Sequence, residues 1–246
     1  MIKLAEIATT PPEGAEKEDI KKKTGELQVR LQYLQRLLWI GKKQSLLVVL
    51  QGLDASGKDG TIGTCLYGVN PMGFKVKGFK APTEEEAAHD FLWRIHPHTP
   101  ERGMIQFFNR SHYEDVLFPR VHKLIDKKET ERRFEHINAF EALLKSNDTI
   151  VLKFYLHMSQ EKQQERFQDR KEDPLKKWKY NEGDLKESKL WPEYISAYED
   201  IFLNCSKPIE WEVIPSDKKW YKEYLVLKSI VKALEDLKLE KVLEQE

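Results

Sequence analysis

The segment Gly52–Lys58, with the sequence GLDASGK, has the residue types and spacing of a loop that surrounds phosphate groups. It fits the pattern G-x-x-x-x-G-K, in which the glycines let backbone N–H groups converge on phosphate oxygens and the lysine reaches the outer phosphates. The apolar run SLLVVLQ precedes it as a buried strand would, and a helix is expected to begin at Lys58. A phosphate-binding loop is therefore predicted, and a plain strand-to-helix turn is the alternative.

Two acidic residues set this loop apart from the ordinary motif. Asp59 stands where a Ser or Thr hydroxyl would ligate Mg²⁺, and Asp54 lies inside the predicted anion site. A carboxylate beside phosphate is repulsive unless a divalent cation lies between them. We therefore expect Asp54 to bind a metal or to orient the acceptor phosphate. Asp59 has either a functional role or the role of an acid at a helix start, which the helix dipole favours.

The segment that follows the third apolar run carries a second group of polar residues, with the sequence NRSHYED. Asn109 stands where related phosphate-transfer enzymes usually place an Asp linked to the metal. Glu114 and Asp115 lie about one helical turn further on and could supply the missing charge. The guanidinium of Arg110 suits bidentate binding of phosphate.

A third candidate is the charged segment 162–179, which contains seven basic and four acidic side chains. Arg166 and Arg170 fall at i and i+4, on one face of a helix. A solvated helix face is the simpler interpretation. A lid that closes over phosphates and excludes water is favoured, because many phosphate-loop kinases have one at this place in the chain. We expect the lid to span about residues 160–185.

These residues must be positioned by a parallel sheet. Apolar runs predict strands at 45–51, 75–80, 104–109, 148–158 and 211–215, and helical patterns alternate with them. The helices are expected at about 16–41, from 58, and at 82–95, 112–125 (broken near Pro119), 129–147, 159–173, 191–203 and from 217. The predicted fold is three-layer α/β/α with a five-stranded parallel sheet. Residues 1–246 are predicted to form one domain, in which 1–13 are a loose leader.

Composition narrows the class of protein further. The 246 residues carry 41 basic and 41 acidic side chains, and this balance argues against a general nucleic-acid binder. Two cysteines are too few for a disulfide framework or a structural zinc site. Neither a membrane-spanning run nor a signal-peptide pattern is present, so a cytoplasmic location without membrane contact is expected.

Four stretches together make the sequence resemble the family-2 polyphosphate kinases. They are GLDASGKDGTI, GVNPMGFKVKGFKAPTEEEAAHDFLWRIH, FNRSHYEDVLFPRV and RFQDRKEDPLKKWKYNEGDL, and they lie in order over most of residues 45–190. The resemblance implies a kinase fold of the thymidylate-kinase type. It also implies reversible phosphate transfer between inorganic polyphosphate and nucleotides, with Mg²⁺, or alternatively Mn²⁺, as the metal.

The motif NRSHYEDV resembles the class III subgroup, which phosphorylates both nucleoside monophosphates and diphosphates. The implied reactions are AMP to ADP and ADP to ATP, and guanine nucleotides are not excluded as partners. The long first and last helices offer apolar faces that could pair subunits of a homo-oligomer, although the same faces could simply cover this chain's own sheet.

Combining the residue patterns with this resemblance gives a set of candidate site residues. The expected catalytic residues are Asp54, Lys58, Arg110 and Asp115, and the expected metal ligands are Asp54, Glu114 and Asp115. Phosphates are expected to contact Gly52, Ala55, Ser56, Gly57, Lys58, Asp59, Arg166, Arg170 and Lys171. The nucleotide is expected to contact Phe79, Lys80, Asn109, Arg110 and Glu114, with the base resting against Phe79.

Two other functions fit part of the pattern. An ATP-dependent nucleoside monophosphate kinase would need the same loop, lid and fold. Asp54, Asn109 and the family resemblance argue against it. A phosphate-loop switch with little turnover usually keeps the Ser or Thr metal ligand that is absent at position 59.

Overall fold

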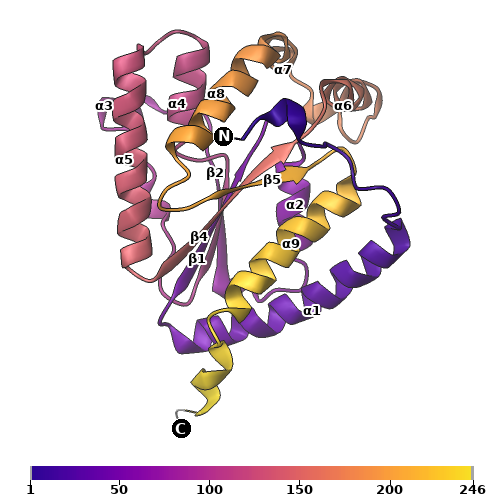
Figure 1. Ribbon diagram of the computed structural model, residues 1–246, viewed down its shortest axis with the longest axis vertical. Coiled ribbons are helices and arrows are strands. Elements are labelled where there is room, and N and C mark those ends of the chain that lie inside the picture. Colours follow the sequence, from indigo (N-terminus) through magenta and orange to yellow (C-terminus); the bar gives the residue numbers. More distant parts are fainter. Residues whose placement is uncertain (1, 245–246) are drawn as a thin grey trace.

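The computed structural model describes residues 2–244, so Met1 of the predicted leader and residues 245–246 of the predicted domain lie outside it. Five strands form one sheet in the order β2-β3-β1-β4-β5, and every neighbouring pair is parallel (Figure 1). The strands are β1 (Ser45–Gln51), β2 (Phe74–Gly78), β3 (Ile105–Asn109), β4 (Thr149–His157) and β5 (Trp211–Pro215). The predicted five-stranded parallel sheet is therefore confirmed.

Helices cover both faces of the sheet (Figure 1). The α-helices are α1 (Lys17–Gly41), α2 (Lys58–Cys65), α3 (Glu84–Ala88), α4 (Glu114–Val121), α5 (Lys127–Ser146), α6 (Gln160–Glu172), α7 (Glu182–Glu187), α8 (Trp191–Asn204) and α9 (Lys219–Glu235). Short 3-10 helices are η1 (Leu4–Glu6), η2 (Pro71–Gly73), η3 (His96–His98), η4 (Lys177–Lys179), η5 (Ser188–Leu190) and η6 (Leu239–Glu244). Within residues 2–244, no helix combines the length and the apolar character that crossing a bilayer requires.

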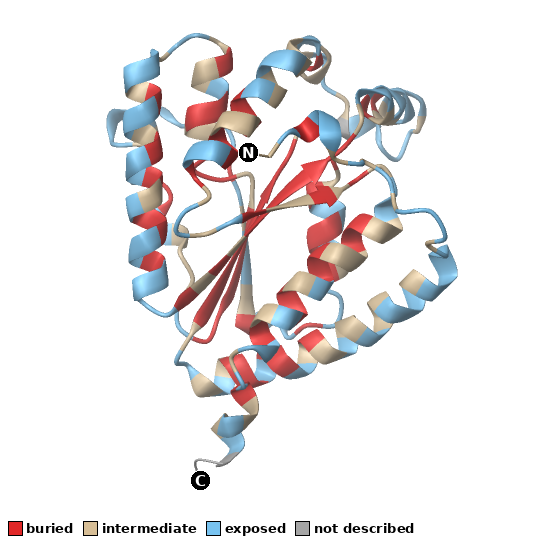
Figure 2. Ribbon diagram, viewed as in Figure 1, coloured by how far each residue is buried: buried red, intermediate tan, exposed pale blue. Residues whose placement is uncertain are grey.

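The core lies on the two sides of the central strand, as alternation of side chains along a strand requires. Leu46, Val48 and Leu50 of β1 pack in a cluster with α1, α2 and α9, whereas Leu47 and Val49 pack on the opposite face with α5. Every residue of β1 is buried, as Figure 2 shows for the middle of the sheet. The strands end together at one edge, so the loops that follow them meet there.

Three expectations about local structure were wrong. The helix predicted over 82–95 ends at Ala88, because Asp90 accepts hydrogen bonds from the backbone N–H groups of Leu92 and Trp93 and starts a separate turn. Pro119 does not break α4. A proline there removes the helical partner of the Asp115 carbonyl, and Arg133 donates to that oxygen instead, at 2.5 Å.

The N-terminal segment is packed rather than loose. Leu4 is buried, and its N–H donates to Glu199 at 2.9 Å. The imidazole of His157 at the end of β4 contacts the carbonyl oxygen of Leu4 at 3.1 Å. Thr9 donates to the carboxylate of Asp217 at 2.7 Å. The short polar residues of this segment predict a loose leader, but the contacts tie the segment to β4, α8 and the loop after β5.

A fully buried ion pair fixes the turn that follows β3. Lys153 of β4 lies 2.7 Å from Glu141 of α5, and neither side chain is exposed. The Tyr113 hydroxyl donates to the same carboxylate at 2.7 Å, and Lys153 also donates to the Cys205 carbonyl at 2.6 Å. Because Tyr113 directly precedes α4, this network positions the residues on either side of it, including Arg110.

We predict that Glu141→Ala lowers the free energy of unfolding by about 3–5 kcal/mol, because it leaves the Lys153 ammonium buried without its counter-charge. The double variant Glu141→Met/Lys153→Met is expected to recover most of the loss, since it removes both charges together. Equilibrium urea unfolding of the two variants and the wild type measures this. A loss below about 1 kcal/mol in Glu141→Ala, the range of a surface pair, would contradict the assignment.

Candidate functional site

The loop Gly52–Lys58 connects β1 to α2 at the carboxyl edge of the sheet and has the conformation that its glycines predict. Gly52, Ala55 and Gly57 all have positive φ values, of 146°, 65° and 92°. A Cβ at position 52 would lie 2.9 Å from the Leu156 carbonyl oxygen, so only glycine fits this close approach to β4. Ala55 carries a left-handed backbone without being glycine, which is a strained conformation typical of functional loops.

Side chains from α6 hold the carbonyl groups of this loop. Gln163 donates to the carbonyl of Asp54 at 2.9 Å, and Arg166 donates to that of Ala55 at 2.8 Å. Because C=O and N–H point in opposite directions across a trans peptide, carbonyls held on one side leave the following N–H groups facing the other side. The Ala55 N–H is thereby directed to the side on which an anion would bind, whereas the Ser56 N–H donates to the Leu53 carbonyl at 3.1 Å and closes the turn of the loop.

Arg166 was predicted to hold phosphate, but the structure gives it a different position. Its guanidinium donates to the Ala55 carbonyl and also to the Ser216 carbonyl, both at 2.8 Å. Burial lowers the pKa of this side chain, although the nearby carboxylates of Asp217 and Glu165 act in the opposite direction. Arg166 therefore supports the loop from behind.

Lys171 is exposed and lines neither of the two cavities described below.

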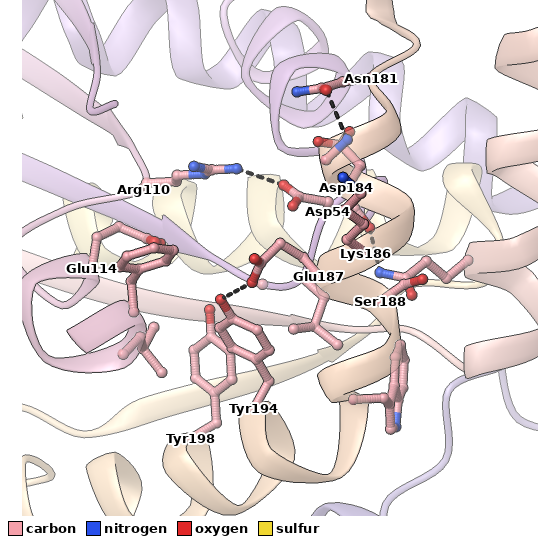
Figure 3. Close-up of a pocket in the computed structure, with 17 residues that line it drawn as sticks. Asp54, Arg110, Glu114, Asn181, Asp184, Lys186, Glu187, Ser188, Tyr194 and Tyr198 are labelled. Atoms are coloured by element: carbon pink, nitrogen blue, oxygen red, sulfur yellow. Dashed lines mark hydrogen bonds and ion pairs between the residues drawn. The ribbon is translucent and has the colours of Figure 1, made fainter. Parts of the chain in front are cut away.

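An ion pair between Asp54 and Arg110 crosses the front of the loop. The Arg110 Nη2 lies 2.5 Å from Asp54 Oδ1, and Arg110 has a left-handed backbone with a φ of 62° (Figure 3). Burial opposes ionisation of Asp54, but the charges of Arg110 and Lys58 outweigh it and lower the carboxyl pKa. Burial likewise opposes the charge of Arg110, yet Glu114 and Asp54 together raise its pKa. Both side chains are ionised at neutral pH.

Two cavities lie on either side of this pair, and Asp54 and Arg110 belong to the walls of both. The first, which we call the phosphate cavity, has a volume of ≈ 340 Å³. Its lining comprises Asp54, Ala55, Gly57, Lys58, Asp59, Gly60, Gly78, Phe79, Lys80, Asn109, Arg110 and Arg170. It combines four cationic side chains with the N-terminus of α2, so it is suited to a chain of phosphates.

The second cavity, which we call the aromatic cavity, has a volume of ≈ 370 Å³ and lies between α4, α7 and α8 (Figure 3). Its apolar walls include Phe118, Trp191, Tyr194 and Tyr198. The Phe118 side chain is 45% exposed, so its ring surface is available to a ligand. The Tyr194 hydroxyl donates to Glu187 at 2.7 Å, which fixes the orientation of that ring. A flat aromatic ligand could stack in this cavity.

Sequence reasoning missed the aromatic cavity. The segment WPEYISAY carries the signal, because Trp191, Tyr194 and Tyr198 recur at helical spacing. Such spacing is ordinary for a core-facing helix, and only the packing of α8 beside the loop shows that these rings line a cavity.

The position of Phe79 does not support the expected base contact. The ring is 3% exposed and packs edge-on against Phe108, with ring centroids 4.9 Å apart, so it has no free face for a base. Lys80 is exposed and lines the phosphate cavity, where its charge suits phosphate rather than a nucleoside. Both residues follow the edge strand β2, and nothing in the sequence pattern indicates which of them points inward.

The two acidic residues at the start of α4, Glu114 and Asp115, lie in different surroundings. Glu114 lines the aromatic cavity, and Gln51, with its amide oriented to suit its neighbours, donates to it at 3.0 Å. Burial raises the pKa of the Glu114 carboxyl. Asp115 instead accepts a hydrogen bond from Arg94 at 2.8 Å and lines neither cavity. Asp115 therefore holds the start of α4 through Arg94, and its position outside both cavities does not support the expected catalytic and metal-binding roles.

Most of the remaining predicted residues lie at the phosphate cavity. Asn109 donates to Asp59 at 2.5 Å, so the end of β3 is tied to the first turn of α2. Arg170 of α6 lines the cavity and pairs with Asp184 of α7 at 3.3 Å. Lys58 is 8% exposed, and its Nζ donates to the Gly52 carbonyl at 2.6 Å. Gly52 lines the aromatic cavity, and Ser56 is fully buried within the loop.

A divalent cation fits Asp54 and Glu114 only in part. Within residues 2–244, no three His, Cys, Asp or Glu side chains gather as a ready metal site. The two carboxylates do line one cavity beside the phosphate cavity. Mg²⁺ is usually held by one or two carboxylates together with substrate phosphates and waters. The donor set therefore fits a Mg²⁺ that arrives with its substrate and does not fit an all-protein metal centre.

Known proteins of one family match most of the chain. Residues 14–242 match the family model described as Polyphosphate kinase 2. The chain is 45% identical over 212 residues to the AMP/ADP-polyphosphate phosphotransferase of Meiothermus ruber, covering 86% of this chain and 79% of that protein. It is 39% identical to the ADP-polyphosphate phosphotransferase of Rhodopseudomonas palustris, covering 85% and 77%.

Among solved structures, polyphosphate kinase 2 from Arthrobacter aurescens superposes with a TM-score of 0.93 at 40% identity. The match covers 96% of this chain and 86% of that one. The five-stranded P-loop kinase fold is thereby shown over nearly the whole chain.

The charge of Lys58 predicts a pH dependence of anion binding. Burial, followed by the charge of Arg110, lowers the pKa of Lys58 to about 8. A phosphate chain binds the protonated form, so the affinity for tripolyphosphate should fall as the pH rises from about 7 to about 9. Calorimetric titration at several pH values measures this. Lys58→Met should bind weakly throughout, with a smaller pH dependence. A wild-type affinity that stays constant across this range would contradict the assignment.

Proposed function

The chain belongs to the polyphosphate kinase 2 family, and we propose that it acts as a class III enzyme, which passes phosphate from inorganic polyphosphate to both AMP and ADP. The observation that carries this proposal is the pair of cavities on either side of Asp54 and Arg110. A transferase must hold a donor and an acceptor so that their reacting ends meet. Two cavities with one shared wall provide that arrangement.

The donor belongs in the phosphate cavity. Phosphates there would meet the N–H groups of the loop Gly52–Lys58 and the cations Lys58, Lys80, Arg110 and Arg170. The one aromatic side chain in this lining, Phe79, is buried, so the cavity favours a bare phosphate chain over a nucleotide donor such as ATP. Local positive charge within a chain of zero net charge suits a polyanion that must enter, shorten and leave.

The acceptor nucleoside belongs in the aromatic cavity. Its base would stack on the exposed ring of Phe118 or on Tyr194, and polar groups of Asn181 and Ser188 line the same space. The terminal phosphate would then point toward Asp54 and Arg110 at the shared wall (Figure 3). Adenine and guanine nucleotides both remain candidates.

Phosphoryl transfer needs little covalent chemistry from the protein, which must align the two substrates and neutralise developing charge. Lys58 contacts the donor end from inside the loop, and Arg110 reaches phosphates on both sides of the wall. Asp54 orients Arg110 through their ion pair. Mg²⁺, with Mn²⁺ as the alternative, would be held by Asp54 and Glu114 and would screen the charge on the phosphates.

We further propose that the protein is a homo-oligomer with a cytoplasmic location. Exposed apolar side chains of α1, namely Val29, Tyr33 and Ile40, provide a surface on which subunits could meet. Sedimentation equilibrium would decide between a monomer and an oligomer.

The function is tested by incubating the protein with AMP, Mg²⁺ and polyphosphate in the absence of ATP. We expect ADP to appear first and ATP to follow, because both AMP and ADP are acceptors. Separation of nucleotides by anion-exchange chromatography measures this, and Lys58→Ala serves as the background control. Product formed only when ATP is the donor would refute the proposal in favour of an ATP-dependent nucleoside monophosphate kinase. ADP without ATP would refute the class III assignment.

Asp54→Asn should lower kcat by about 100-fold or more, because it removes the charge that orients Arg110 and that would hold the metal. Asp148→Asn makes the same chemical change in an exposed residue after α5, at the opposite edge of the sheet, and should leave kcat near that of the wild type. Circular dichroism checks that both variants fold. A kcat of Asp54→Asn close to the wild-type value would remove Asp54 from the mechanism.

A further inference from the structure

A second lysine lies directly behind the phosphate-binding loop, and no sequence motif marks it. Lys222 of α9 is 2% exposed, and its Nζ donates to the carbonyls of Ser56 and Gly57 at 3.0 and 3.2 Å. The ammonium is so close that a Cβ added at Gly57 would lie 2.3 Å from it. Glycine at position 57 therefore serves both the left-handed turn and this contact.

The two carbonyls depend on Lys222 to different degrees. The Gly57 carbonyl also accepts from the Thr61 N–H and hydroxyl, each at 3.1 Å. For the Ser56 carbonyl, Lys222 is the donor that the structure shows within residues 2–244. Gln163 and Arg166 hold the carbonyls of Asp54 and Ala55. Lys222 thus completes the support of the loop on the side away from the phosphate cavity.

The surroundings of Lys222 make its positive charge unfavourable unless an anion is near. Arg166 of α6, Lys58 of α2 and Lys219 of α9 are cationic neighbours, and Glu223 of α9 is the acidic one. Burial, followed by the charge of Arg166, lowers the pKa of Lys222 to about 7. Phosphates in the loop would be separated from this ammonium by a single layer of backbone, and their charge would favour its protonated form.

On the basis of the proposed function, we infer that Lys222 is a positioning residue for phosphate transfer. It orients the peptide groups of Ser56 and Gly57 so that the N–H groups of Gly57 and Lys58 face the polyphosphate. Its charge adds to the attraction for the chain through the backbone. The nucleotide lies on the other side of Asp54, so its binding should depend little on Lys222.

The test compares Lys222→Met, Lys222→Arg and the control Lys228→Met. Lys228 lies on the same helix, is exposed, and sits over the Tyr224 ring at 5.9 Å, away from the loop. Tripolyphosphate binding is measured by calorimetry without nucleotide. Because Lys222→Met removes a buried charged donor, its affinity for tripolyphosphate should be weaker by about 10-fold or more. The tripolyphosphate affinity of Lys228→Met should change by less than about twofold. The AMP affinity of each variant should also change by less than about twofold.

The pH profile separates this role from simple stabilisation of the fold. Wild-type affinity should begin to fall above about pH 7, where Lys222 must gain a proton for binding. In Lys222→Arg the charge is permanent, so the decline should start only above about pH 8, where Lys58 loses its proton. If Lys222→Met does not fold, this comparison alone decides the question.

Several results would overturn the inference. A folded Lys222→Met with wild-type affinity for tripolyphosphate would do so, as would equal weakening of AMP and tripolyphosphate binding. Identical pH profiles of Lys222→Arg and the wild type would exclude a role for the lysine charge. A wild type that binds tripolyphosphate but makes no product would refute the proposed function alone, because the binding comparison contains no nucleotide.

Discussion

The ion pair between Asp54 and Arg110 is the interaction on which the site depends. A loop that gathers anions cannot hold a half-buried carboxylate unless that charge is compensated, and Arg110 compensates it at 2.5 Å. In return, the carboxylate holds a guanidinium where two cavities meet. At the turn that carries this guanidinium, Arg110 has a left-handed backbone. The buried network of Glu141, Tyr113 and Lys153 holds the end of the same turn.

Support for the loop comes from parts of the chain that are far apart in sequence. Helix α6 supplies Gln163 and Arg166, and the last long helix α9 supplies Lys222. These three donors bind loop carbonyls, so the N–H groups of Gly57 and Lys58 can face phosphate, whereas the Ser56 N–H donates to the Leu53 carbonyl within the loop. A chain with equal numbers of acidic and basic side chains can therefore present a strongly positive local surface.

Much of the fold could be predicted from the sequence, because buried parallel strands are continuous apolar runs and β5 was located to the residue. The loop Gly52–Lys58 was equally clear, since its glycines are required by backbone geometry. Predictions failed where a distant side chain decides the local structure, as Arg133 does for Pro119 and as the packing against β4 does for the leader. The aromatic cavity and Lys222 were missed for the same reason, because rings and lysines at helical spacing have no special meaning until the helices are packed.

The central claim is that polyphosphate and nucleotide occupy separate cavities divided by Asp54 and Arg110. A crystal structure with AMP, Mg²⁺ and a non-hydrolysable polyphosphate analogue tests it most directly. The account predicts the adenine ring against Phe118 or Tyr194, and the analogue against the N–H groups of Gly57 and Lys58. Adenine bound beside Lys80, or both ligands on the same side of the Asp54–Arg110 pair, would contradict it.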